Sequence, residues 1–422
     1  MNHPQPPPHE GPRAHRLRRM AGRDPREKHR VATPLELLFD LTFVVAFGLS
    51  ASEFAHLLVT GHVGAGLTAF LFATFAICWA WINFTWFASA YDTDDWVYRL
   101  MTMVQMVGVL ILALGLPRFF ASIEHGDHVD NTVLAAGYVV MRIALVAQWL
   151  RAAKQDPEHR AACLTYATVV TAVQVGWIGT VFMYAPVPLS LTIWALLAGA
   201  EMLGPRLAEG RGGTPWHAHH IAERYSLLAI IALGEGVVGT VASLSAVVGE
   251  HGWTTEAVLL VVAGTGLTFG MWWVYFVVPA ADLLHVRREA SFVFGYVHMA
   301  VIGAIVATGA GLHTAAYYVE GHSELGEVGT VFAVAIPVGV FIGLVYVVYA
   351  LLVRTTEAFH LLLLALTAAV LVAAVALAML GVSMAICLLV VTIAPVVTVV
   401  GFEMRGHREA AEALAARLAN PS

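Results

Sequence analysis

Uncharged apolar runs recur along the whole chain and alternate with short segments that carry charge, glycine or proline. Each run is close to the roughly 20 apolar residues that a helix needs to cross the hydrocarbon layer of a bilayer. The pattern predicts an all-α polytopic membrane protein with about twelve transmembrane helices. We expect them near residues 35–58, 63–90, 97–116, 130–150, 160–183, 187–204, 220–248, 255–278, 290–313, 328–352, 358–379 and 382–402.

Composition supports this assignment and weighs against a soluble helical protein. The 422-residue chain is 59% hydrophobic and 12% charged, whereas about 25% of the residues in soluble domains are charged. The cysteines, Cys78, Cys163 and Cys387, lie inside apolar runs at no metal-like spacing. We therefore expect buried thiols and no disulfide framework.

Basic residues are distributed unevenly between the two sets of loops. Cytoplasmic loops of membrane proteins are enriched in Lys and Arg. If the N-terminus lies inside, all of the 23 basic residues except Arg118 and Arg142 fall on the inner side. The outer segments 124–130, 250–256 and 320–327 are acidic and carry histidine. We therefore predict a multi-pass protein of the cytoplasmic (inner) membrane with both termini in the cytoplasm.

Two segments with similar aromatic endings indicate an internal repeat. The second and eighth expected helices end in the aromatic stretches 79–84 and 272–276, and an acidic turn and a basic residue follow each. The pattern predicts two parallel six-helix halves, related by an axis along the membrane normal. The alternative is that the aromatic ends mark only the membrane interface. The expected domains are a disordered basic tail 1–33, a first half 34–204, a cytoplasmic linker 205–218, a second half 219–403 and a cytoplasmic tail 404–422.

An ionisable group at the centre of a membrane helix costs about 2.5–3.5 kcal/mol of insertion free energy, so such residues are rare and often functional. The carboxylates of the first expected helix are therefore candidates for function. Glu36 and Asp40 are spaced to share one helix face. Asp40 lies one turn deeper and is the better functional candidate. The alternative is a structural carboxylate that pairs with a neighbouring arginine.

The seventh expected helix holds the other candidates. Glu223 and Arg224 open it, and Glu235 lies about three turns beyond Arg224, near the middle of the bilayer. Arg142 is the single basic residue that we place within a span, so it is the natural counter-charge. We expect Asp40, Arg142 and Glu235 to converge in a polar cavity between the first, fourth and seventh helices. A purely structural arginine–carboxylate pair is the alternative.

Histidines are frequent, but their spacing matches no known metal motif. His298 and His313 in the ninth expected helix are too far apart for one metal ion, and the cluster 217–220 lies at the inner membrane edge. Glu357 and His360 have the spacing of half a carboxylate–histidine metal site, but no second copy occurs. We predict no metal site.

Other polar positions have ordinary explanations. Glu201 and Glu403 close the sixth and twelfth expected helices, where a carboxylate can reach the membrane surface. No P-loop, dinucleotide glycine fingerprint, serine nucleophile elbow or haem motif occurs. The sequence therefore names no cofactor and predicts the lipid bilayer, not nucleic acid, as a partner.

Residues 33–44 resemble the opening of the first helix in the bacterial low-temperature-requirement A family, which reads Glu-Leu-Phe-Phe-Asp-Leu-Val-Phe. Segments 223–225 and 233–235 are similar to the family's Glu-Arg-Phe and Leu-Gly-Glu-Ser, and 296–298 resembles a further family pattern. Leu38, Thr42 and Gly236 depart from the usual residues. The resemblance implies no settled reaction or substrate. The residues that stand at family motif positions are Glu36, Asp40, Glu223, Arg224, Glu235 and His298.

These features favour a transporter or channel for a small solute or ion. The residues expected to bind that solute are Glu36, Asp40, Arg142, Glu223, Arg224, Glu235 and His298. One alternative is an intramembrane enzyme for a lipid-soluble substrate, with Asp40 or Glu235 as acid or base. Another is a membrane-stress or structural protein without turnover. The substrate and the oligomeric state stay open.

The charge asymmetry makes a testable prediction about topology. Cysteines placed at Gly126 and Gly321 are expected to react with an impermeant thiol reagent added outside intact cells. A cysteine at Gly212 is expected not to react, because it lies in a basic segment predicted to be cytoplasmic. Labelling of position 212 in intact cells would contradict the predicted topology.

Overall fold

The computed structural model describes residues 17–25, 27, 30–126, 128–354 and 358–406. Within these ranges every regular element is a helix. Twelve helices are long and apolar enough to cross a membrane. The predicted all-helical, polytopic fold is thus confirmed.

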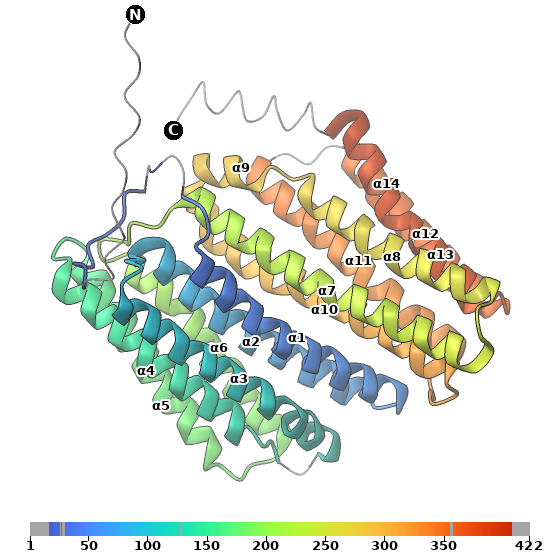
Figure 1. The fold of residues 1–422 in the computed structure, drawn as a ribbon, viewed down its shortest axis with the longest axis horizontal. Helices are drawn as coiled ribbons and strands as arrows, with labels where there is room; N and C mark the ends of the chain where they lie inside the picture. The colour runs from blue at the N-terminus through green and yellow to red at the C-terminus, as the bar shows by residue number, and fades with distance from the viewer. Residues whose placement is uncertain (1–16, 26, 28–29, 127, 355–357, 407–422) are drawn as a thin grey trace, which may run out of the picture.

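The first half of the chain forms six helices that lie together on one side of the molecule (Figure 1). Helices end later than predicted in several places, because polar residues near a membrane surface do not stop a helix. The first six are α1 (Pro34–Val59), α2 (Val63–Tyr91), α3 (Trp96–His125), α4 (Thr132–Gln155), α5 (Arg160–Val181) and α6 (Val187–Glu209).

The second half differs from the expected helices in two details. A short helix follows the eighth span, and the last span is divided where Pro395, which lacks an N–H, interrupts the helical hydrogen bonds. The helices are α7 (Ala218–His251), α8 (Thr255–Phe276), α9 (Ala280–Val286), α10 (Ser291–Val319), α11 (Gly326–Val353), α12 (Ala358–Met379), α13 (Met384–Val391) and α14 (Ile393–Gly401).

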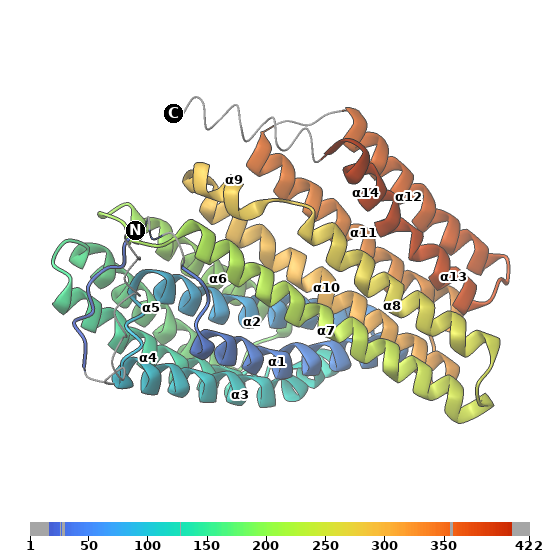
Figure 2. The ribbon, with the colours of Figure 1, turned by 45° about the horizontal axis from the view of Figure 1, so that its top comes forward.

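The two halves meet where α1 and α2 pack against α7 and α10. Figure 1 and Figure 2 both show α7 and α10 between α1 and the outer helices α8 and α11. Neighbours repeat in order: α1 packs on α2 and α3, and α3 on α4; likewise α7 packs on α8 and α10, and α10 on α11. The parallel duplication itself stays a prediction.

Local sequence explains where α1 begins. Thr33 caps the helix: its Oγ1 accepts the Glu36 N–H at 3.3 Å, and its own N–H donates to Glu36 Oε2 at 2.7 Å. Pro34 occupies the first turn, where its missing N–H is not needed. This capping box fixes the entry of α1 and, with it, the place of Glu36 at the first turn.

The N-segment, which we define as residues 17–25, 27 and 30–33, is packed against the helices, whereas the sequence predicted a disordered tail over 1–33. Met20 is fully buried, the Arg23 N–H donates to the Ala90 carbonyl at 3.0 Å, and Arg30 is buried. Residues 1–16 lie outside the described residues, as does the tail beyond 406. The basic residues misled the prediction because their carboxylate partners lie far away in sequence. We call this end of the bundle, where α1 begins, the basal end.

The opposite, distal end contains the turns where the labelling cysteines were proposed. Gly126 and Gly321 have φ angles of 80° and 71°, a conformation that strains a cysteine. The exposed neighbours His125 and His322 are therefore better positions for the label.

Close contact between α7 and α10 depends on glycine. A Cβ at Gly309 of α10 would lie 2.7 Å from Glu235 Cβ and 2.8 Å from the Glu235 carbonyl carbon of α7. The Ser243 hydroxyl of α7 donates to the Leu312 carbonyl of α10 at 2.6 Å. Small residues let membrane helices approach to this distance.

This contact predicts that Gly309→Ala destabilises the protein by about 1–3 kcal/mol, because the methyl group overpacks the interface. Gly234→Ala is the matched control on α7, since a Cβ there meets nothing within 4 Å. Thermal unfolding of the purified variants in detergent measures both. Equal melting temperatures for the two variants would contradict the packing.

Candidate functional site

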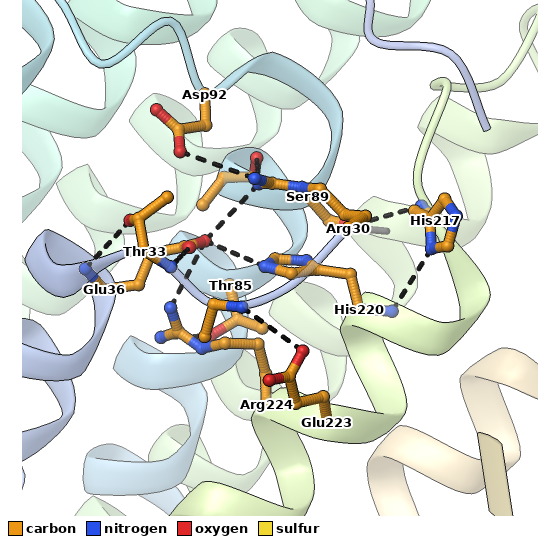
Figure 3. A network of polar contacts seen from close by, with 12 residues as sticks. Arg30, Thr33, Glu36, Thr85, Ser89, Asp92, His217, His220, Glu223 and Arg224 are labelled. Atoms are coloured by element: carbon orange, nitrogen blue, oxygen red, sulfur yellow. Dashed lines mark hydrogen bonds and ion pairs between the residues drawn. The ribbon is translucent and has the colours of Figure 1, made fainter. Parts of the chain in front are cut away.

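Two acidic residues of α1 pair with a buried arginine of α7 at the basal end, and Figure 3 shows one of them, Glu36, beside Arg224. Arg224 is fully buried, and its NH2 lies 2.6 Å from Asp40 Oδ1 while its NH1 lies 3.3 Å from Glu36 Oε1. The Trp81 indole N–H of α2 donates to the same Asp40 oxygen at 2.7 Å. Arg224 thus joins the first half to the second through two charges.

The N-segment adds a second cation to this group. Figure 3 shows Arg30 between Asp92 and Glu36, and each of these ion pairs measures 3.7 Å. His220 Nε2 lies 3.1 Å from Glu36 Oε1. We call these residues the ionic cluster: Arg30, Glu36, Asp40, Asp92, His220 and Arg224.

Groups at the basal membrane edge titrate differently because their surroundings differ. Burial, together with the charge of Glu36, raises the pKa of Asp92 to about 6 beside Arg30. Burial also opposes ionisation of Asp95, but hydrogen bonds from Arg151, the Tyr98 N–H and the Arg18 N–H lower its pKa to about 2. The Arg18 N–H bond to Asp95, at 3.1 Å, fastens the start of the N-segment to the beginning of α3.

A cavity of about 470 Å³ lies beside the ionic cluster, between the N-segment and α7 to α11. His298 of α10 is one of the polar residues that line it. The His298 Nδ1–H donates to the Phe294 carbonyl at 2.7 Å, so in the neutral ring Nε2 accepts the Tyr275 hydroxyl at 3.1 Å. The other polar residues that line it are Arg30, His217, His219, Glu223, Ser226 and Asp282.

Glu223 lines this cavity and faces the N-segment. Its Oε2 accepts the Ala32 N–H at 3.2 Å, but no cation of the described chain forms an ion pair with it. Burial lowers the pKa of the nearby His217, which favours its neutral ring. In the described ranges no group of three His, Cys, Asp or Glu side chains could hold a metal ion.

The structure does not bring Arg142 together with Asp40 and Glu235, so that expectation was wrong. Arg142 NH2 lies 2.5 Å from Glu201 Oε2, and its NH1 donates to Asn83 Oδ1 at 3.3 Å. Trp79 and Trp177 donate their indole N–H groups to the same Glu201 carboxylate. Arg142 and Glu201 therefore form a separate buried pair inside the first half.

Sequence reasoning missed Glu201 because it ended the sixth helix too early. α6 continues through Pro205 to Glu209, which places Glu201 two turns inside the helix instead of at its end. The neighbours also differ from expectation, since α4 packs against α2, α3 and α5. The available signal in the sequence was that Glu201 and Arg142 both fall within apolar helices of the same half, where each needs a partner.

Glu235 is left without a counter-charge. The residue is 4% exposed, and no hydrogen bond or ion pair joins it to any residue that the structure describes. A Cβ at Gly48 of α1 would lie 3.2 Å from Glu235 Oε1, so the carboxyl group faces the α1 backbone. Glu235 therefore lies at the junction of α1, α7 and α10.

The family model described as "Bacterial low temperature requirement A protein (LtrA)" matches residues 31–395. The chain belongs to this family. It is also similar to an uncharacterised protein of Rhizobium meliloti (strain 1021), with 28% identity over 296 residues that cover 65% of this chain and 67% of that protein. No solved structure matches the chain. The LtrA match includes every residue of the ionic cluster except Arg30.

The two buried pairs predict a specific pattern of coupling. Arg142→Met should destabilise the protein by about 3–5 kcal/mol, because it leaves the Glu201 charge buried alone. Adding Glu201→Gln should recover part of the loss, whereas adding Asp40→Asn should give an additive loss. Unfolding free energies in a double-mutant cycle measure both couplings, each resolvable above about 0.5 kcal/mol. Coupling of Arg142 to Asp40 but not to Glu201 would contradict the assignment.

Proposed function

We propose that this LtrA-family protein transports a small solute or ion, which it binds in the basal cavity. The observation that carries the proposal is a cavity of about 470 Å³ lined by ionisable side chains at the end of a membrane-spanning bundle. Small-molecule sites are typically about 300–1,000 Å³ and contain a few well-placed polar groups. This cavity has both properties.

The distribution of basic residues supports a cytoplasmic mouth for the cavity, and cytoplasmic termini in the inner membrane. The N-segment with Arg18, Arg19, Arg23 and Arg30 lies at the basal end, as do the α2–α3 turn and the α6–α7 link. Basic residues mark the cytoplasmic side of bacterial membrane proteins. The protein would then bind its solute from the cytoplasm in this conformation.

Contacts between the halves at and near the distal end favour a carrier over an open channel. At the distal end the Glu324 N–H after α10 donates to the Val59 carbonyl of α1 at 2.8 Å. Between this contact and the cavity, α7 and α10 touch at Gly309. A carrier exposes one side at a time by moving one half against the other, and the ionic cluster lies across that boundary.

The charges of the lining favour a solute with a positive charge or an amine. Arg30 is compensated by Glu36 and Asp92. Glu223 has no cationic partner among the described residues, and Asp282 is exposed at the mouth. Two carboxylates without paired cations leave the cavity with net negative character, which attracts a cation.

A direct test begins with binding. A panel of amines, amino acids and inorganic cations is screened for thermal stabilisation of the purified protein, and stabilising compounds are then tested for flux in proteoliposomes. We expect a cationic compound to bind and to move. Glu223→Gln should weaken its binding at least tenfold, because the carboxylate is lost from the cavity.

Glu327→Gln, a carboxylate change in the first turn of α11 at the distal end, is the matched control and should transport like the wild type. Flux that is unaffected by Glu223→Gln would contradict the proposed cavity. Conversion of a compound without any flux would favour the intramembrane enzyme instead.

A further inference from the structure

The inference concerns Glu235, and it rests on the proposed transport function. Glu235 lies at the middle of α7, about nine residues beyond Ser226 of the cavity, or about 14 Å along the axis at 1.5 Å per residue. The residue is buried, and no described residue donates a hydrogen bond to it or forms an ion pair with it. The buried carboxylates of Glu36, Asp40 and Glu201 are different, because Arg224 pairs with the first two and Arg142 with the third.

An ionised carboxylate in this position is expensive. Removing it from water without a counter-charge costs several kcal/mol even after relaxation, so such a group takes up a proton instead. The neutral acid carries no net charge to compensate and fits among apolar helices. Glu235 in this packing is therefore the acid, not the carboxylate.

The location links that proton to the packing of the two halves. Glu235 faces Gly48 of α1 on one side and touches Gly309 of α10 on the other. The carboxylate form needs water or donors around it, and no described residue supplies a donor while these helices are in contact. Movement of α1 away from α7 and α10, which is motion between the halves, would admit the water that stabilises the carboxylate.

No titratable group on α1, α7 or α10 forms an ion pair with Glu235 in the described structure. On α1, Glu53 lies about 8 Å from the level of Gly48 and Asp40 about 12 Å, and Asp40 is already paired. On α10, His313 lies about 6 Å from the level of Gly309 and His298 about 16 Å. On α7 itself, Arg224 is paired with α1. None of them contacts the Glu235 carboxyl.

We propose that Glu235 is the proton-binding group of the transport cycle. It holds a proton while α1, α7 and α10 are packed as here and releases it to water when these helices separate. Only the O–H bond of the carboxyl breaks and re-forms, and water on the open side accepts or supplies the proton. Solute movement through the cavity is thereby coupled to proton movement.

The first test reads the protonation state of the full-length protein without transport. Glu235→Gln is isosteric with the neutral acid, so its melting temperature should stay within about two degrees of the wild type, whereas Glu201→Gln should lower it by more. Dicyclohexylcarbodiimide reacts with protonated carboxyl groups in apolar surroundings. Mass spectrometry of one digest of the treated protein should show at least tenfold more modification of Glu235 than of Glu201. A large loss of stability in Glu235→Gln would show an ionised, paired Glu235 and overturn the proposal.

The second test uses proteoliposomes with a pH-sensitive dye inside and the cationic solute identified by the stability screen. Wild type and Glu327→Gln should move protons with the solute, and Glu235→Gln should move none. Solute flux without protons in the wild type, or flux that depends on sodium, would overturn this proposal and leave the transport function standing. Absence of all flux would overturn the transport function, and the melting and labelling results would still decide the protonation of Glu235.

Discussion

The pairing of buried charge is the constraint on which this fold depends. Within a bilayer a lone charge is costly, so each buried ion needs a partner from another helix. Arg224 of α7 lies between Glu36 and Asp40 of α1, and Arg142 of α4 lies against Glu201 of α6. The first pair fixes one half against the other, and the second fixes the interior of the first half. Glu235 is the exception, because it has no ion-pair partner among the described residues. It lies at the boundary between the two halves, where its protonation can affect how they pack.

Sequence alone predicted which elements form and roughly where they cross the membrane. Long apolar runs specify helices without reference to any partner, and the Thr33–Glu36 capping box marks the beginning of α1. Helix ends were less predictable. α6 continues past the point where its apolar run stops, because a helix surrounded by protein and lipid headgroups tolerates Arg206 and Glu209.

The partners of buried charges could not be predicted, because partner choice depends on which helices are neighbours. Glu36, Asp40 and Arg224 were recognised individually, but their association follows from α1 packing on α7. The pairing of Arg142 was predicted wrongly for the same reason. Arg30 was missed because a basic residue before the first span resembles a solvated tail, and only the fold shows Glu36 and Asp92 around it.

If the two halves move against each other during transport, the distal contact between α1 and the α10–α11 turn opens during the cycle. Spin labels at the exposed residues His62 and His322, one on each side of that contact, report the motion directly. Double electron–electron resonance should give a short distance at neutral pH and a second, longer population when the transported cation is added or the pH is raised. A single short distance under all of these conditions would contradict the account.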